Sequence, residues 1–273
     1  MKINEIAPGR CGIMGILNVT PDSFYDGGRY SDRTRAVKRA FEMAEEGADI
    51  IDIGGQSTRP GSSPVDTDTE RERVVPVIKE LKKAAGDILL SCDTSNLQIA
   101  REALDAGADM INDVTGFENK DMRDTAAEHD AAVVIMHMRG RPETMQNNPS
   151  YGDVLEEIKS FLYERAGLCR EAGVKKENIM IDPGIGFGKI MEDNLKILAN
   201  TAYFNGEYPL LIGASRKSFL KTLLGLEVAE RLSGSLAAAL YCCADKVDML
   251  RVHDVKETAE AVSVTEELIK RKL

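Results

Sequence analysis

Eight short apolar runs recur along the chain, and each is followed by a polar loop and a segment with helical spacing. They lie at residues 12–19, 49–55, 88–94, 110–116, 131–137, 179–184, 210–216 and 249–254. Strands that alternate with helices predict parallel pairing with right-handed crossovers. Eight such units over about 250 residues are typical of a TIM (β/α)8 barrel. Because no linker, low-complexity segment or shift in composition interrupts the pattern, we expect one α/β domain over residues 1–273.

Two helical segments have recognisable ends. In the segment 31–47 we expect Ser31 or Asp32 to be the N-cap, because both residue types accept hydrogen bonds from free backbone N–H groups at a helix start. Gly47 is expected to end this helix. The segment 94–107 repeats the scheme and ends at Gly107. Its predicted buried face is Ile99, Ala100, Ala103 and Leu104.

A doubly wound sheet would alternate strands and helices in the same way. Nucleotide-binding examples of that fold carry a GxGxxG motif after the first strand, and this chain has none there. The stretch DPGIGFGK also lacks the first glycine of a phosphate-binding GxxxxGK[ST] motif. Neither nucleotide-binding motif thus supports a doubly wound sheet, and the number of strand–helix units favours the barrel.

Composition excludes several kinds of protein. The formal net charge of −10 argues against binding nucleic acid or an anionic membrane, because both require a basic surface. No apolar run is long enough to span a bilayer, and the N-terminus lacks the unbroken apolar segment of a secretory signal. We therefore expect a cytoplasmic protein. Its five cysteines show no CxxC spacing, which predicts buried, reduced thiols.

Polar residues stand at the ends of nearly all the predicted strands. In a TIM barrel these carboxyl ends meet at one rim, where the chemistry takes place. A single polar residue could be a turn former or a helix cap, but many ionisable groups at one rim need each other or a ligand. A polar ligand is the simplest explanation. In strand order the residues are Asn18, Gln56, Thr58, Arg59, Asp93, Asn112, His137, Asp182, Ser215, Arg216, Lys217, Arg251 and His253.

Two loops at this rim are long. Residues 20–31 and 56–67 exceed the usual two to six residues of such connections and are rich in Gly, Pro and Ser. We interpret them as lids over the site, with tolerated surface insertions as the alternative.

Eight motifs resemble those of the dihydropteroate synthase family and occur in the family's order between residues 13 and 255. They are GILNVTPDSFYDGG, IDIGGQSTRPG, SCDTS, INDVTG, VIMHM, IDPGIGFGK, IGASRKSF and RVHDV. The resemblance implies a TIM barrel that condenses p-aminobenzoate with 7,8-dihydropterin-6-ylmethyl diphosphate, giving 7,8-dihydropteroate and pyrophosphate in folate synthesis. It also implies the use of Mg2+, a homodimer, and a binding site for p-aminobenzoate, the substrate that sulfonamides mimic.

The resemblance also implies roles for individual residues. Those matching the family's pterin contacts are Asp93, Asn112, Asp182 and Lys217, with Met136 and Phe187 as apolar walls. Those matching the diphosphate anchors are Arg59, Arg251 and His253, and Asn18 matches the Mg2+ ligand. Those matching the p-aminobenzoate site are Phe24, Thr58, Pro60, Lys217 and Ser218. The residues expected to be catalytic are Asp26, Arg59, Asp93, Lys217, Arg251 and His253.

The chemistry of these residue types fits the reaction. A pterin edge presents N–H donors beside a carbonyl acceptor, which suits carboxylate and amide partners. At several positions an ordinary structural role stays open as the alternative. Met136 and Phe187 could be ordinary core residues, Arg59 an exposed loop arginine, and Asp26 a turn former.

The sequence departs from the family at Gln56, where the family commonly has Glu in GGESTRPG. The change removes a negative charge near the second predicted lid. Other functions also stay open. A pterin-binding methyltransferase domain would share the barrel and pocket, but it needs neither a diphosphate anchor nor an aniline lid, so Asn18, residues 22–26, Arg59 and the run 216–218 argue against it. A non-catalytic ligand-binding barrel and a phosphosugar enzyme are weaker alternatives.

Overall fold

Eight parallel strands form a single closed sheet in the computed structural model, which describes residues 2–20, 29–56, 65–142 and 144–271. The sheet order is β6-β5-β4-β3-β2-β1-β8-β7, and a parallel bridge between Ile181 and Leu210 joins its two edges. This closure confirms the predicted TIM barrel and rules out the doubly wound sheet. The strands are β1 (Gly12–Asn18), β2 (Ile50–Gly54), β3 (Leu89–Asp93), β4 (Met110–Asp113), β5 (Ala132–Met136), β6 (Ile179–Asp182), β7 (Leu211–Ile212) and β8 (Met249–Val252).

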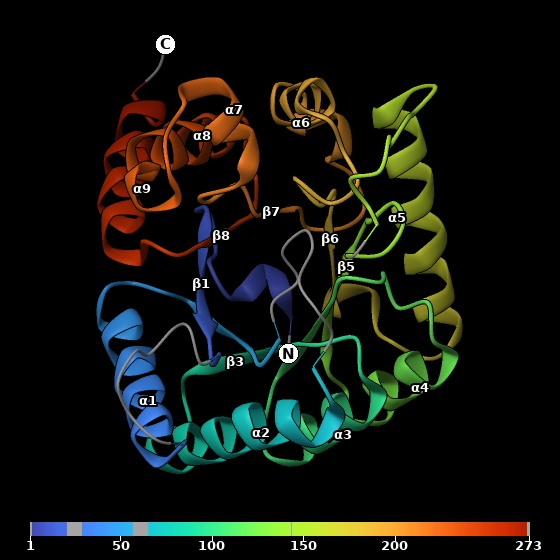
Figure 1. The fold of residues 1–273 in the computed structure, drawn as a ribbon, viewed down its shortest axis with the longest axis vertical. Helices are drawn as coiled ribbons and strands as arrows, with labels where there is room; N and C mark the ends of the chain where they lie inside the picture. Colours follow the sequence, from blue (N-terminus) through green and yellow to red (C-terminus); the bar gives the residue numbers. More distant parts are fainter. Residues whose placement is uncertain (1, 21–28, 57–64, 143, 272–273) are drawn as a thin grey trace.

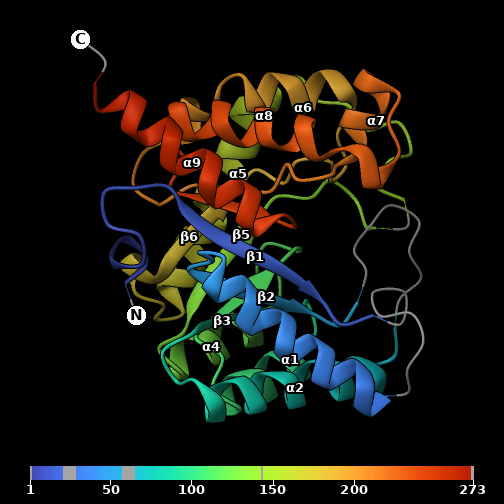
Figure 2. The same cartoon turned by 90° about the vertical axis from the view of Figure 1, so that its left-hand side faces the viewer.

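Helices surround the strands (Figure 1). In the turned view α6, α8 and α9 lie on one side of the strands, and α1 and α2 lie on the other (Figure 2). The α-helices are α1 (Arg29–Glu45), α2 (Thr67–Ala84), α3 (Leu97–Asp105), α4 (Lys120–Glu128), α5 (Val154–Glu171), α6 (Met191–Leu198), α7 (Ser218–Leu224), α8 (Leu232–Ala244) and α9 (Val255–Ile269). Short 3-10 turns are η1 (Ile3–Glu5), η3 (Lys176–Asn178), η4 (Thr201–Phe204) and η5 (Val228–Glu230).

Alternation along the strands separates two apolar clusters. Ile13 and Ile51 belong to the large cluster that also contains the buried faces of the helices, whereas Met14 and Ile50 belong to a smaller cluster inside the barrel. Ile3 of η1 joins the inner cluster at the amino end of the barrel. Apolar packing therefore fills the amino half of the barrel interior and leaves room for polar residues in the carboxyl half.

Three of the four predictions made for these two helices are confirmed. Gly47 and Gly107 both have positive φ, and α3 buries its four predicted apolar residues. The fourth prediction was wrong: α1 begins at Arg29, so Ser31 and Asp32 lie in its first turn and neither is the cap. An acid anywhere in the first turn gains from the positive end of the helix dipole, so its presence does not fix the cap position.

The five cysteines are buried and free, as predicted: Cys11, Cys92, Cys169, Cys242 and Cys243. Cys92 belongs to the large cluster between the strands and the helices, on the opposite face of β3 from the barrel interior. Within the described residues, no helix has the length and apolarity to cross a membrane.

Candidate active site

One pocket at the carboxyl ends of the strands gathers the residues that the sequence marks as pterin contacts. Its lining residues are Asp93, Asn112, Val114, Met136, Asp182, Ile185, Phe187, Gly213, Lys217 and Arg251. They come from β3, β4, β5, β6 and β8 and from the turns after β4, β6 and β7. All six expected pterin contacts thus lie around one space, together with one of the expected diphosphate anchors.

Arg251 crosses the barrel interior and pairs with two acids. Its Nε donates to Asp52 Oδ2 at 2.6 Å, and its Nη2 donates to Asp93 Oδ2 at 2.6 Å. Asn112 Nδ2 also donates to Asp52 Oδ2, at 3.0 Å. Asp52 is 0 % exposed, so this pairing compensates a fully buried charge.

Asp52 is a residue of this site that the sequence analysis did not single out. It lies inside the apolar run 49–55, where it reads as part of a buried strand. An acid at an inward position of such a strand needs a buried partner, and that requirement is the signal that could have identified it.

Burial and charge shift the ionisation of the two acids that line the pocket. The pKa of Asp93 is raised to about 7, chiefly by burial; Arg251 and Lys217 oppose the rise, and the charge of Asp52 adds to it. Burial also raises the pKa of Asp182, and the Gly184 N–H, which donates to Asp182 Oδ1 at 2.7 Å, partly offsets this. Such shifts are common where charged groups take part in function.

The apolar wall of the pocket is a cluster of its own. Val114, Met136, Met145 and Phe187 pack together, separate from the two larger clusters. Lys217 Nζ lies 4.1 Å from the centre of the Phe187 ring, within the range of a cation–π contact. Of the two alternatives for Met136 and Phe187, this arrangement favours the pocket wall over ordinary core packing.

The loop that carries Phe187 is held by side chains from several elements. Gln146 Nε2 donates to the Gly186 carbonyl at 2.7 Å, and the Tyr151 hydroxyl donates to the Gly188 carbonyl at 2.8 Å. Lys189 Nζ lies 3.0 Å from both the Phe187 carbonyl and His137 Nδ1. The loop is therefore built as a wall that presents Phe187 to the pocket.

Lys189 and His137 hold the Phe187 loop in place on the side away from the pocket. Burial lowers the pKa of Lys189 to about 7 and the pKa of His137 to about 2. Neither side chain lines the pocket, although His137 was among the polar strand ends expected at the rim. The sequence analysis missed Lys189, whose partners become visible only when the loop is folded.

Gly184→Ala should disrupt this loop. Gly184 has a φ of +69°, and a Cβ there would lie 2.1 Å from the His137 carbonyl oxygen. Left-handed strain and forced repacking together should lower the free energy of unfolding by about 2–5 kcal/mol. Gly225→Ala is the matched control, because Gly225 has a φ of +72° but open space around it; it should cost about 1–2 kcal/mol. Urea denaturation measures both, and equal losses would contradict the steric argument.

His253 lies beside Ser215 and is uncharged at neutral pH. Its Nδ1 lies 3.1 Å from Ser215 Oγ, and its backbone N–H donates to the same oxygen at 3.2 Å. Burial, together with the nearby Arg251, Arg216 and Lys217, lowers the pKa of His253 to about 3. As an anchor for a diphosphate, an uncharged His253 would offer a hydrogen bond.

Other expected site residues are placed less completely. Asn18 ends β1 and is half-buried, and Ser218 is the exposed first residue of α7. Gln56 follows β2. Five expected site residues lie outside the described residues: Phe24, Asp26, Thr58, Arg59 and Pro60. Large parts of both predicted lids lie outside them as well.

A TIM barrel with buried acids, an asparagine and a lysine around one rim pocket is the arrangement expected of a pterin-binding enzyme, and the family model described as "Pterin binding enzyme" matches residues 14–253. The chain is 44% identical to the dihydropteroate synthase of Escherichia coli (strain K12) over 261 residues, which cover 95% of this chain and 92% of that protein. The chain belongs to the dihydropteroate synthase family.

Solved structures agree with this assignment. A dihydropteroate synthase from Yersinia pestis with a sulfonamide drug complex has a TM-score of 0.90 and 40% identity, over 97% of this chain and 98% of that one. A dihydropteroate synthase from Xanthomonas albilineans with 4-aminobenzoic acid has a TM-score of 0.89 and 42% identity, over 95% and 93%. Relatives of this kind favour the synthase over the methyltransferase and non-catalytic alternatives.

Proposed function

We propose that this chain condenses p-aminobenzoate with 7,8-dihydropterin-6-ylmethyl diphosphate, giving 7,8-dihydropteroate and pyrophosphate. The observation that carries the proposal is the single pocket in which the six expected pterin contacts converge, in a chain of this family. Asp93 and Asp182 would accept hydrogen bonds from the pterin N–H groups, and Asn112 can both donate and accept. Lys217 would donate to the pterin carbonyl, while Met136 and Phe187 cover the faces of the ring.

The reaction needs no side-chain nucleophile. The bond between the methylene carbon and the diphosphate oxygen breaks, and the bonding electron pair leaves with pyrophosphate. The aniline nitrogen of p-aminobenzoate then attacks the methylene carbon and loses a proton. Positive charge develops on the electron-rich dihydropterin as the bond loosens, so ionised Asp93 would stabilise the transition state more than the substrate.

Further charge is needed at the diphosphate end, because the protein as a whole is acidic. Arg59 and Arg251 are the proposed cationic anchors, and His253 is the proposed hydrogen-bond donor. Each close contact between opposite charges near a protein surface contributes up to about 4 kcal/mol. In the first predicted lid, Asp26 is proposed to assist departure of the diphosphate, and Phe24, Thr58, Pro60 and Ser218 are proposed to line the p-aminobenzoate site together with Lys217.

The donor chemistry at the end of β1 fits Mg2+. Among the described residues, no group of three or more His, Cys, Asp or Glu is arranged to hold a metal ion. We propose the Asn18 amide oxygen, water and the diphosphate of the substrate as ligands of a cation at this rim, and Mg2+ commonly binds in this way. When bound, the ion would supply positive charge to the leaving group. Isothermal titration with Mg2+ in the presence of pyrophosphate tests this, and equal affinity in Asn18→Ala would count against it.

Pyrophosphate release tests the proposed function. Purified protein with the dihydropterin diphosphate and Mg2+ should release pyrophosphate only when p-aminobenzoate is present. Release should collapse in Asp93→Ala and in Arg59→Ala. No release from the wild-type protein, with pterin binding retained, would overturn the condensation and favour a methyltransferase or a binding protein.

Pterin affinity should depend on pH. The raised pKa of Asp93, about 7, means that its carboxyl group is protonated below that pH and loses an acceptor for the pterin N–H groups. Affinity should therefore be level above pH 7 and fall as the pH is lowered, by up to about tenfold for each unit. Calorimetric titration with the dihydropterin diphosphate measures this profile. Asp93→Asn should flatten it, and an affinity that increases towards acid pH would contradict the assignment.

A homodimer is also proposed. Leu223 and Leu224 of α7, Val228 of η5 and Tyr241 of α8 are exposed apolar residues on neighbouring elements, as expected for an association surface. Sedimentation should give twice the mass of the chain, and Leu223→Glu with Tyr241→Glu should reduce it to one chain. Leu268→Glu, at an exposed leucine of α9, is the control and should leave the dimer intact. A monomeric wild-type protein would refute the proposal.

We also place the enzyme in the cytoplasm. The five cysteines are buried and free, as is usual for proteins of a reducing compartment. Cell fractionation would test this, and recovery of the protein from an extracytoplasmic fraction would count against it.

A further inference from the structure

The turn between β7 and α7 contains a residue in a strained conformation next to the site. Arg216 has a φ of +55°, in the left-handed region that residues with a Cβ rarely adopt. It directly precedes Lys217, which lines the pocket. Backbone strain of this kind persists only when surrounding contacts hold it.

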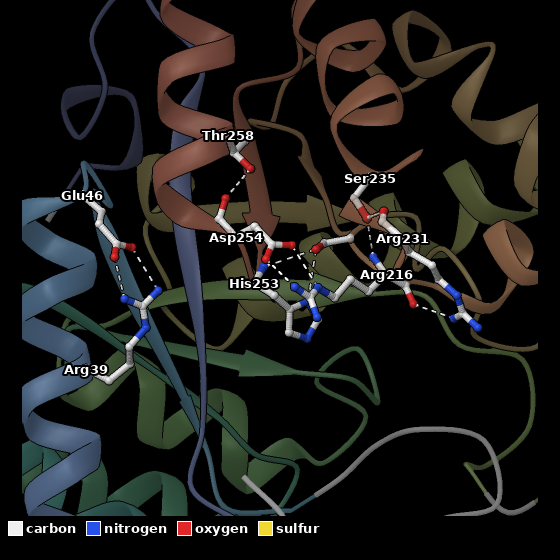
Figure 3. A network of polar contacts seen from close by, with 9 residues as sticks. Arg39, Glu46, Arg216, Arg231, Ser235, His253, Asp254 and Thr258 are labelled. Atoms are coloured by element: carbon white, nitrogen blue, oxygen red, sulfur yellow. Dashed lines mark hydrogen bonds and ion pairs between the residues drawn. The ribbon is translucent and has the colours of Figure 1, made fainter. Parts of the chain in front are cut away.

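Three groups hold Arg216 in this conformation (Figure 3). Its backbone N–H donates to Ser235 Oγ at 2.9 Å, and its carbonyl accepts from Arg231 Nη1 at 2.9 Å. Its guanidinium forms a two-pronged ion pair with Asp254, in which Nε donates to Oδ2 at 2.9 Å and Nη2 donates to Oδ1 at 2.5 Å. Both the backbone and the side chain of Arg216 are therefore fixed.

The ion pair connects two turns that each carry an expected ligand contact. Asp254 follows His253 in the turn between β8 and α9, and its carbonyl accepts from Thr258 Oγ1 at 2.7 Å (Figure 3). The neighbouring residue Ser215 contacts His253. Ser215 thus contacts His253, and Arg216 binds Asp254. These two contacts join the turn after β7 to the turn after β8, so Lys217 and His253 keep a fixed separation.

The side chain of Arg216 is directed to this contact rather than to the pocket. Its charge is paired with Asp254, and Arg216 does not line the pocket that contains Lys217. In the sequence, Arg216, Lys217 and Ser218 form one polar run after the seventh predicted strand. The structure separates the run, because Lys217 faces the pocket and Arg216 faces Asp254.

We propose that Arg216 is a positioning residue, which fixes Lys217 and His253 relative to each other through its ion pair with Asp254. The proposal rests on the proposed function and deepens it, because the two residues that it aligns would contact the pterin and the diphosphate. Arg216 itself does not contact the diphosphate.

The chain offers a matched control for this ion pair. Arg39 of α1 and Glu46, which directly follows this helix, form a two-pronged pair at 2.6 and 2.9 Å that is also labelled in Figure 3. Its side chains are 30% and 24% exposed, against 28% and 15% for Arg216 and Asp254. Arg39→Gln therefore removes a comparable interaction at a site with no expected role in the reaction.

The experiment compares wild type, Arg216→Gln, Asp254→Asn, the double variant and Arg39→Gln. One measurement is kcat/KM for the dihydropterin diphosphate, and the other is calorimetric affinity for inorganic pyrophosphate. Each single variant near the site should lower both quantities by at least about tenfold, and the double variant should be no worse than either single variant, because both remove the same interaction. Arg39→Gln should stay within about twofold of wild type.

Asp254→Asn distinguishes positioning from direct binding. If Arg216 bound the diphosphate directly, freeing it from Asp254 would leave pyrophosphate affinity unchanged or increase it, and that result would overturn the proposal. Asp254→Asn keeps the Arg216 side chain and the hydrogen bonds of its backbone with Ser235 and Arg231, so this variant also tests the proposal if Arg216→Gln does not fold. Additive losses in the double variant would overturn the proposal as well.

The pyrophosphate titration separates this inference from the proposed function. A wild-type protein that binds pyrophosphate but forms no dihydropteroate would refute the condensation, while the comparison of variants still decides the role of Arg216. A wild-type protein that does not bind pyrophosphate would overturn the inference.

Discussion

Asp93→Asn should lower kcat/KM for the dihydropterin diphosphate by about 30-fold to several thousand-fold. The carboxylate is buried in the pocket and pairs with Arg251 at 2.6 Å, and loss of one member of a buried, hydrogen-bonded charge pair costs about 2–5 kcal/mol. An amide of the same shape would present an N–H donor or a neutral oxygen to the pterin in place of a charge. Steady-state kinetics with both substrates measure the loss.

Asp109→Asn is the matched control for this prediction. Asp109 precedes β4 at the opposite end of the barrel, where it pairs with Lys82 at 2.7 Å and accepts from the Leu90 N–H at 2.9 Å. The variant should lose some stability but keep kcat/KM within about twofold of wild type. Similar activities for the Asp93 and Asp109 variants would show that Asp93 has no special role in the reaction.

Arg251→Met should lower the free energy of unfolding by about 3–5 kcal/mol. It removes the ion-pair partner of Asp52, which is 0 % exposed and would then keep, among the described residues, only the hydrogen bond from Asn112. Removing one partner of a buried ion pair has this cost because the other charge is left uncompensated. Urea denaturation monitored by circular dichroism gives the value.

A second substitution tests that explanation. Asp52→Asn in the Arg251→Met background should restore a large part of the lost stability, because a neutral amide needs no buried counter-charge. Arg39→Met, which breaks a partly exposed ion pair, should cost about 1 kcal/mol or less. If Asp52→Asn instead adds to the loss, the buried charge is not the cause.

The sequence is sufficient to predict the fold because its strand signals are strong and local. Each apolar run is short and is followed by a helical segment, and the structure contains a strand within each of the eight predicted ranges. The start of α1 was not predicted correctly, since Ser31 and Asp32 suit the first turn as well as the cap. The sequence signal thus marks the presence of this helix better than its first residue.

The candidate site is predictable where its residues end strands and is not predictable where they pair across the barrel. Asp93, Asn112 and Asp182 are found because polar residues that end parallel strands meet at one rim. Asp52 is missed because its partner Arg251 is 199 residues away along the chain. The uncharged state of His253 depends on burial and on nearby cations, which the order of residues does not reveal.

Product analysis is the most direct test of the central claim. Wild-type protein, incubated with the dihydropterin diphosphate, p-aminobenzoate and Mg2+, should form 7,8-dihydropteroate and pyrophosphate in equal amounts, as measured by liquid chromatography with mass detection and by a coupled phosphate assay. Omission of p-aminobenzoate should abolish both products. Pyrophosphate without dihydropteroate, or neither product from protein that still binds the pterin, would contradict the assignment of this pocket to the condensation.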